Sequence, residues 1–93
     1  MNKSEIVIEI TRFVAHQANI ADAAAIGEEL DLFEQGILDS LMAALLVSFC
    51  QQRFDCDLIG ENISEDEIRT IAGIANVIVR QINSEKYSRA IDC

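Results

Sequence analysis

The sequence predicts a single all-α domain, a four-helix bundle with a long loop between the first two helices and a short third helix. Two observations predict this class. Of the 93 residues 51% are hydrophobic, but only 5% are aromatic and Trp is absent, so the core must consist mainly of Ile, Leu, Val and Ala. Apolar residues also recur at helical spacing in separate segments. Residues 4–83 are expected to form the folded core and residues 84–93 a flexible tail.

The first helix is expected over residues 4–18, because an apolar series follows Ser4, a favoured N-cap residue. The series consists of Ile6, Val7, Ile10, Phe13 and Val14. Residues 19–39 contain Gly27, Gly36 and several acids, and they are expected to form a long loop of the kind that is usually functional. Its apolar residues would pin it to the core: Leu30, Leu32, Phe33, Ile37 and Leu38.

The second helix is expected over residues 40–54, a strongly apolar run without Gly or Pro. A loop over residues 55–63 follows, and Ser64 then precedes three acids, which predicts the start of a short third helix. Thr70 is a further cap candidate, and the fourth helix would run from there to about Asn83. One set of side chains should be buried together in the core: Phe33, Leu46, Phe54, Ile71 and Ile78.

The formal net charge of -9 disfavours nucleic acid and anionic lipid as partners, because both are negatively charged. No apolar run approaches the ~20 residues that span a bilayer, and Glu5 and Glu9 interrupt the place where a signal peptide would be apolar. We therefore expect a cytoplasmic protein that does not bind a membrane.

The negative charge is concentrated locally. Between Glu28 and Glu67 there are eleven acidic residues and one basic residue, Arg53. Acids of this kind can simply keep a small domain soluble. Their one-sided distribution around the second helix could instead steer a basic partner surface toward it.

No catalytic or metal constellation stands out. His16, the only histidine, is expected to be a solvated residue of the first helix, and no Ser or Cys lies beside it at a mechanistic spacing. The three cysteines lack a CxxC spacing and should be reduced thiols, with Cys50 in the core, Cys56 in a loop and Cys93 in the tail. The protein is thus not expected to be an enzyme.

The segment from Asp55 to Gly60 begins like a calcium-binding loop, with acids at its first and third positions. It departs from that pattern at Ile59, in the fifth position, and at Asp66, where a bidentate Glu is needed. No metal site is expected.

The Asp39-Ser40 pair has an ordinary explanation, because both residues are favoured at helix starts. The wider string DLFEQGILDSL at residues 31–41, however, resembles the phosphopantetheine attachment motif of acyl carrier, peptidyl carrier and D-alanyl carrier proteins. Further matches lie at Phe54, at residues 63–64 and at residues 68–71. The resemblance implies a bundle of the acyl-carrier-protein type and 4'-phosphopantetheine on Ser40, flanked by Asp39 and Leu41.

The residues also suit this chemistry on physical grounds. A serine at a helix N-terminus is exposed, and a phosphodiester there would meet unpaired backbone N–H groups and the positive end of the helix dipole. Gly36 would allow a tight turn, while Phe33, Ile37 and Leu38 would anchor the loop so that Ser40 faces outward.

The second helix departs from the carriers of bacterial fatty-acid synthesis, whose partner-facing side is acidic. The corresponding positions here are Met42, Leu45 and Arg53, and Phe49 lies on the same strip. We expect Met42, Leu45 and Phe49 to form an apolar docking strip, as suits carriers that meet adenylating ligases or assembly-line modules. Alternatively, the long loop covers this edge of the helix.

The favoured hypothesis is a discrete, monomeric carrier of a small aminoacyl group, held as a thioester on the arm. The resemblance implies three partners, namely a phosphopantetheinyl transferase, an ATP-dependent aminoacyl or acyl carrier ligase, and a downstream acceptor enzyme. Two alternatives stay open. One is a carrier of a small acyl or polyketide extender unit, and the other is a non-modified helical interaction module, since fold does not fix function.

Overall fold

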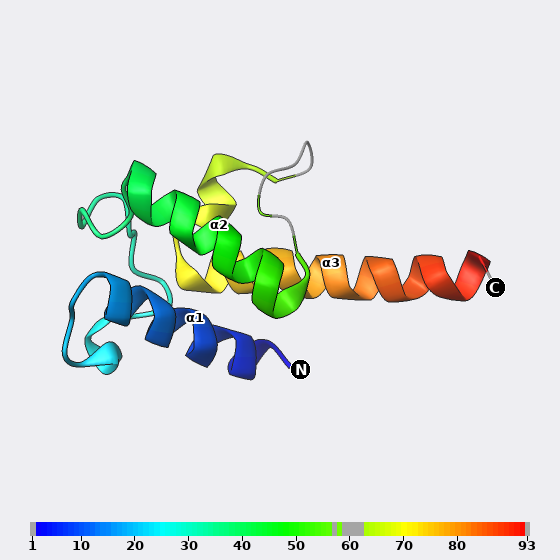
Figure 1. Cartoon of the computed structure of the whole chain (residues 1–93), viewed down its shortest axis with the longest axis horizontal. Helices are drawn as coiled ribbons and strands as arrows, with labels where there is room; N and C mark the ends of the chain where they lie inside the picture. The colour runs from blue at the N-terminus through cyan, green and yellow to red at the C-terminus, as the bar shows by residue number, and fades with distance from the viewer. Residues whose placement is uncertain (1, 57, 59–62, 93) are drawn as a thin grey trace.

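The computed structural model describes residues 2–56, 58 and 63–92, with the side chains described up to Asn83. The described chain is all-helical and contains no strand. Three α-helices, α1 (Lys3–Gln17), α2 (Ser40–Phe54) and α3 (Ile71–Asp92), are joined by segments that contain the 3₁₀ turns η1 (Ala23–Ala25) and η2 (Glu65–Ile68). Helix α1 packs against both α2 and α3, and the C-terminal part of α3 extends beyond the other two helices (Figure 1).

Helix α1 begins slightly earlier than its sequence pattern predicted. Asn2, and not Ser4, is the N-cap, and its Oδ1 accepts a hydrogen bond from the N–H of Glu5 at 2.9 Å. The prediction of Ser4 was wrong because Asn caps a helix as well as Ser does, so the earlier residue starts the helix. The predicted inward face is confirmed, since Ile6, Ile10 and Val14 are buried.

Helix α2 has the predicted bounds. Asp39 caps its start, and Asp55 ends it in the left-handed conformation with φ 55°, donating its N–H to the carbonyl of Gln51 at 3.1 Å. A left-handed residue that bonds back to the last turn is a common helix C-terminus, and Asn or Asp adopts it more readily than most non-glycine residues.

The predicted third helix is only the 3₁₀ turn η2, so a bundle of four α-helices is not confirmed. Ser64 lies at its N-cap position but makes no side-chain capping bond. A new helix begins soon afterwards, because the Thr70 Oγ1 accepts a hydrogen bond from Gly73 N at 3.0 Å, as the sequence predicted. The segment before Thr70 therefore has room for only a short, tight turn.

Helix α3 does not end near Asn83 as predicted but continues to Asp92. The residues beyond Asn83 contain neither Gly nor Pro, so no local signal stops the helix there. The prediction gave too much weight to the end of the apolar stripe.

The core is aliphatic, as the composition predicted. Of the predicted core set, Leu46, Ile71 and Ile78 are buried, whereas Phe33 and Phe54 are half-buried and pack against the core from its edge. The largest fully buried side chains come from α1, the loop before α2, α2 and α3: Ile6, Ile10, Val14, Leu32, Cys50, Ile71, Ile74, Val77 and Ile78.

Candidate functional site

Ser40 is the first residue of α2 and is exposed. The capping role belongs to its neighbour, because Asp39 Oδ1 accepts a hydrogen bond from Met42 N at 2.8 Å and Asp39 O accepts one from Ala43 N at 2.8 Å. The Ser40 hydroxyl is therefore not required to cap the helix. A helix start with a separate cap and an exposed hydroxyl can hold a covalent group without losing its own stabilising bonds.

The backbone at this position suits a negatively charged group. The N–H groups of Ser40 and Leu41 lie in the first turn of α2, where no carbonyl one turn earlier in the helix can accept from them. The helix dipole also places its positive end there. Leu41, the other predicted neighbour of the site, is 69% exposed, so the surface beside Ser40 is open.

The chain that leads into Ser40 is a closed turn. Leu32 O accepts hydrogen bonds from the N–H groups of Ile37 and Leu38, both at 3.0 Å, and Leu32 and Leu38 are buried. Gly36 takes φ 73°, a left-handed conformation that favours glycine, as the motif predicted. The predicted pinning of the loop is confirmed, with Leu30, Phe33 and Ile37 packing against the core from partly buried positions.

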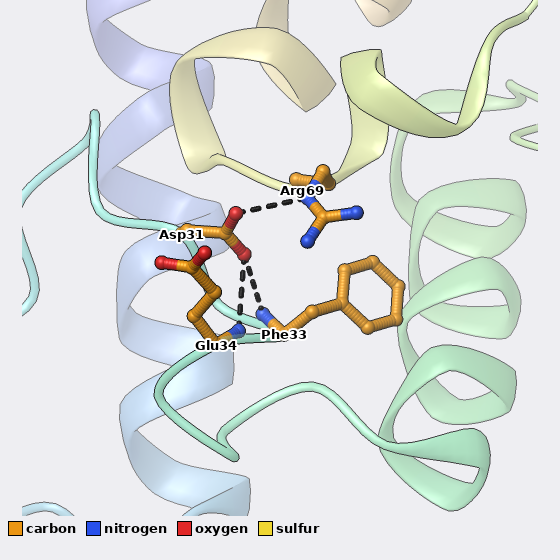
Figure 2. Close-up of polar contacts among 4 residues, drawn as sticks. All are labelled: Asp31, Phe33, Glu34 and Arg69. Carbon is orange, nitrogen blue, oxygen red and sulfur yellow. Dashed lines mark hydrogen bonds and ion pairs between the residues drawn. The ribbon is translucent and has the colours of Figure 1, made fainter.

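A contact that the sequence did not reveal joins this turn to the junction of η2 and α3 (Figure 2). Asp31 Oδ1 accepts from the N–H groups of Phe33 at 3.0 Å and Glu34 at 3.1 Å, while Asp31 Oδ2 accepts from Arg69 Nε at 2.8 Å. The Arg69 guanidinium also lies over the Phe33 ring, 5.4 Å from its centroid. The hydrogen bond from Arg69, together with those from the Glu34 and Phe33 N–H groups, lowers the pKa of Asp31.

The predicted docking strip does not exist as one surface. Met42 is buried at 7% exposure, because it lies one turn before Leu46 on the core face of α2. Phe49 is half-buried and stacks on Phe13 of α1, with ring centroids 4.2 Å apart. Only Leu45 is exposed, at 37%. The alternative prediction was that the long loop covers the strip. At Phe49 the covering element is instead α1, through Phe13.

The exposed apolar face of α2 is displaced from the predicted one. It contains Leu41, Ala44 and Leu45, with Ser48 at its far end, and all four are exposed. They are three and four residues apart, so they follow one line along the helix that starts beside Ser40. The sequence could not identify this face, because α2 is apolar on most of its circumference.

An apolar cavity of about 360 Å³ lies between α2 and η2. Its walls are aliphatic side chains from the loop before Ser40, from α2, from the segment after α2 and from η2: Leu38, Ala43, Ala44, Leu46, Val47, Leu58 and Ile68. Leu38 and Ala43 flank Ser40 in the chain, so the cavity is close to the helix start. No sequence signal had indicated a cavity here.

The remaining candidate groups do not assemble into a reactive site. His16 is exposed, as predicted. Cys50 and Cys56 are buried, and burial, together with the neighbouring Cys56, raises the pKa of the Cys50 thiol to about 12. Within the described residues no group of His, Cys, Asp or Glu could hold a metal ion. Part of the calcium-like segment and Cys93 lie outside the residues that the structure describes.

The helices that the structure describes include none that is long and apolar enough to cross a membrane.

These features define a class: a small helical domain that presents a hydroxyl at the exposed start of a helix. The family model described as the phosphopantetheine attachment site matches residues 9–78, and the chain therefore belongs to that family. Domains of this family carry covalently attached 4'-phosphopantetheine and act as non-catalytic tethers that are modified by phosphopantetheinyl transferases and interact with partner enzymes. Searches of the curated proteins and of the solved structures gave no match.

Proposed function

We propose that Ser40 is the attachment residue and that the protein is a carrier of a small aminoacyl group in the cytoplasm. The observation that carries the attachment is the exposed Ser40 at the start of α2, with Asp39 supplying the cap. The donor set fits a phosphodiester, because the first-turn N–H groups and the helix dipole favour an anion at this place. Within the motif at residues 31–41, Ser40 is the only residue with a hydroxyl side chain.

In the attachment reaction the carrier supplies only the Ser40 hydroxyl. Ser40 Oγ attacks a phosphorus of coenzyme A in the active site of a phosphopantetheinyl transferase and forms the phosphodiester bond. The bond from that phosphorus to the nucleotide portion breaks, 3',5'-ADP leaves, and the hydroxyl proton passes to a base of the transferase. When attached, the cofactor supplies a thiol that holds cargo as a thioester. The chain itself contributes presentation and a local concentration set by the length of the tether.

The similarity of residues 31–41 to the motif of D-alanyl carriers supports an aminoacyl cargo, loaded by an ATP-dependent ligase and passed to a downstream acceptor enzyme. An aminoacyl group carries an ammonium ion. The cavity between α2 and η2 offers only aliphatic side chains, and burying an unpaired ammonium ion among them would be costly. An aminoacyl cargo would therefore stay in solvent, where the acceptor enzyme can reach it.

The cavity favours a second candidate, a carrier of a small acyl group. Its apolar walls next to the start of α2 could hold an acyl chain without leaving any polar group unpaired. Loading the holo protein with a short acyl chain should then shift the methyl NMR signals of Leu46 and Ile68, whereas aminoacyl loading should leave them in place. If neither cargo shifts these signals, the cavity does not support an acyl cargo.

Partner enzymes would dock on the exposed face of α2, which starts beside Ser40 at Leu41 and continues through Leu45. Acidic residues flank this helix in sequence on both sides, which would speed encounter with basic partner surfaces, while the apolar centre would supply affinity.

Co-expression with a broad-specificity phosphopantetheinyl transferase tests the attachment. The intact mass should rise by one phosphopantetheinyl group, and Ser40→Ala should abolish the rise while leaving the helical circular dichroism spectrum unchanged. Ser48→Ala, a change at an exposed serine of the same helix, is the matched control and should be modified normally. An unmodified wild-type chain, under conditions that convert a known carrier, would favour the non-modified interaction module.

A further inference from the structure

We propose that Arg69 is a positioning residue for the modification of Ser40, acting through the turn that leads into α2. Arg69 lies at the junction between η2 and α3, far from Ser40 in sequence. It holds three successive residues of that turn and so fixes the direction in which Ser40 is presented. The inference rests on the proposed attachment of the cofactor to Ser40.

Arg69 makes three different interactions with the turn, and Figure 2 shows those with Asp31 and with the Phe33 ring. Its Nε donates to Asp31 Oδ2 at 2.8 Å, and its backbone carbonyl accepts from Leu32 N at 2.8 Å. Its guanidinium lies 5.4 Å from the centroid of the Phe33 ring, within the range of a cation–π contact. One residue therefore restrains Asp31, Leu32 and Phe33 at the same time.

The restraint continues toward Ser40 through contiguous bonds. Asp31 fixes the N–H groups of Phe33 and Glu34, and Leu32 O accepts from the N–H groups of Ile37 and Leu38. Leu38 is buried and immediately precedes the capping residue of α2. Movement of the turn would therefore change how the first residues of α2 are presented.

Removal of the Arg69 side chain should loosen this turn without unfolding the domain. Two backbone anchors remain, from Leu32 N to Arg69 O and from Ala72 N to Glu28 O at 2.9 Å. Both ion-pair partners are partly exposed, with side-chain exposures of 32% for Arg69 and 28% for Asp31, so their attraction is screened by solvent and adds little to global stability.

The chain offers a matched control in the pair Arg80–Glu67. Arg80 also donates to a carboxylate at 2.8 Å, and Glu67 belongs to η2, but both residues lie on the η2 and α3 side and do not reach the turn before Ser40. A variant of Arg80 removes an ion pair of the same length, in which the arginine side chain is 54% exposed instead of 32%, and leaves the turn untouched. Only an effect specific to Arg69 would support positioning.

A loosened turn lowers the fraction of molecules that present Ser40 correctly. This raises the apparent KM of the transferase for the carrier, because the apparent dissociation constant is the intrinsic one divided by the competent fraction. Loss of an exposed ion pair and a cation–π contact predicts a rise of about 3- to 10-fold. The kcat at saturating carrier should stay within about 2-fold, because the bound complex is the same.

The experiment measures initial rates of holo-protein formation by mass spectrometry, with purified transferase, coenzyme A and increasing apo protein. Arg69→Gln should raise KM with kcat unchanged. Arg69→Lys keeps the charge but loses the planar group over Phe33, and should lie in between. Arg80→Gln should match the wild type. A KM for Arg69→Gln equal to that of Arg80→Gln, or a KM that tracks the melting temperature across all variants, would overturn the proposal.

A second readout is independent of the transferase. Amide hydrogen exchange of the apo protein should be faster at Phe33, Glu34 and Leu38 in Arg69→Gln than in Arg80→Gln, with exchange in α1 unchanged. Equal exchange in both variants contradicts the positioning role, even if Arg69→Gln has a raised KM. If the wild type is not modified at Ser40, the proposed function fails, while the exchange data still decide whether Arg69 restrains the turn.

Discussion

Two faces of α2 are similarly apolar in sequence and opposite in environment. Met42, Leu46 and Cys50 follow one line along the helix and are buried, whereas Leu41 and Leu45 follow another and are exposed. The difference is made entirely by what packs on each line. An apolar side chain therefore marks a docking surface here only where the neighbouring elements leave it open, and the open line starts at the residue after Ser40.

The sharpest contrast between the two faces comes from the same change at two nearby positions. Met42→Asp places a charge on the buried face and should cost about 3–5 kcal/mol of unfolding free energy. Leu45→Asp places it on the exposed face and should stay within about 0.5 kcal/mol of the wild type. Urea unfolding followed by circular dichroism measures both. Similar losses at the two positions would mean that α2 is rotated from the orientation described here.

Truncation extends the contrast without adding charge. Leu46→Ala removes a side chain that is 2% exposed and should cost about 2–5 kcal/mol through lost transfer energy and the cavity that remains. Leu41→Ala, at 69% exposure, should change stability by less than about 0.5 kcal/mol. Thermal or urea unfolding of both variants checks the difference, and a loss below about 1 kcal/mol for Leu46→Ala would contradict the buried face.

The exposed face should matter to partners instead of to folding. Leu45→Asp should raise the KM of the transferase or the loading ligase by about 5- to 10-fold, the effect of losing one good interface contact. The dependence of KM on salt should be modest, because an apolar centre carries the affinity. Gln51→Asp, which adds the same charge at an exposed position of α2 that is off the line of Leu41 and Leu45, is the control. An equal rise in both variants would show a general charge effect.

The smallest expected effect concerns the turn that leads into the exposed face. In the folded state the pKa of Asp31 lies below its ordinary value of 3.8. The charged form of Asp31 therefore stabilises the fold above about pH 4, and this stabilisation is lost as the pH falls through the lowered pKa. Asp31→Asn keeps an oxygen for the N–H groups of Phe33 and Glu34 but removes the charge. Its stability should lie slightly below that of the wild type near neutral pH and converge with it in acid, as measured by urea unfolding at several pH values. A constant difference across this range would exclude the ion pair as its cause.

Local signals in the sequence predicted most of α2 and its site. Asp39 and the uninterrupted apolar run gave the correct bounds of the helix, and Gly36 gave the turn before it, because caps and left-handed positions depend on a few neighbouring residues. The predicted end of α3 was wrong, because a helix can continue past its apolar stripe when no Gly or Pro stops it. The predicted third helix is only one 3₁₀ turn in the structure, because Thr70 starts a new helix soon after Ser64.

The faces of α2 and the role of Arg69 could not be predicted for a different reason. With apolar residues on most of its circumference, α2 has no periodic signal to separate Met42 from Leu45, and only packing against α1 and the core does so. The contact of Arg69 with Asp31 joins residues far apart in the chain, and nothing in either local sequence indicates the other. Both features depend on tertiary structure.

Mapping the modified residue decides whether Ser40 carries the cofactor. The chain should be modified in vitro with coenzyme A and a purified transferase, digested, and the modified peptide fragmented in the mass spectrometer. We expect a phosphopantetheinyl group on Ser40 alone and an unmodified digest from Ser40→Ala. Modification at Ser48 or Ser64, or none while a control carrier is fully converted, would contradict it.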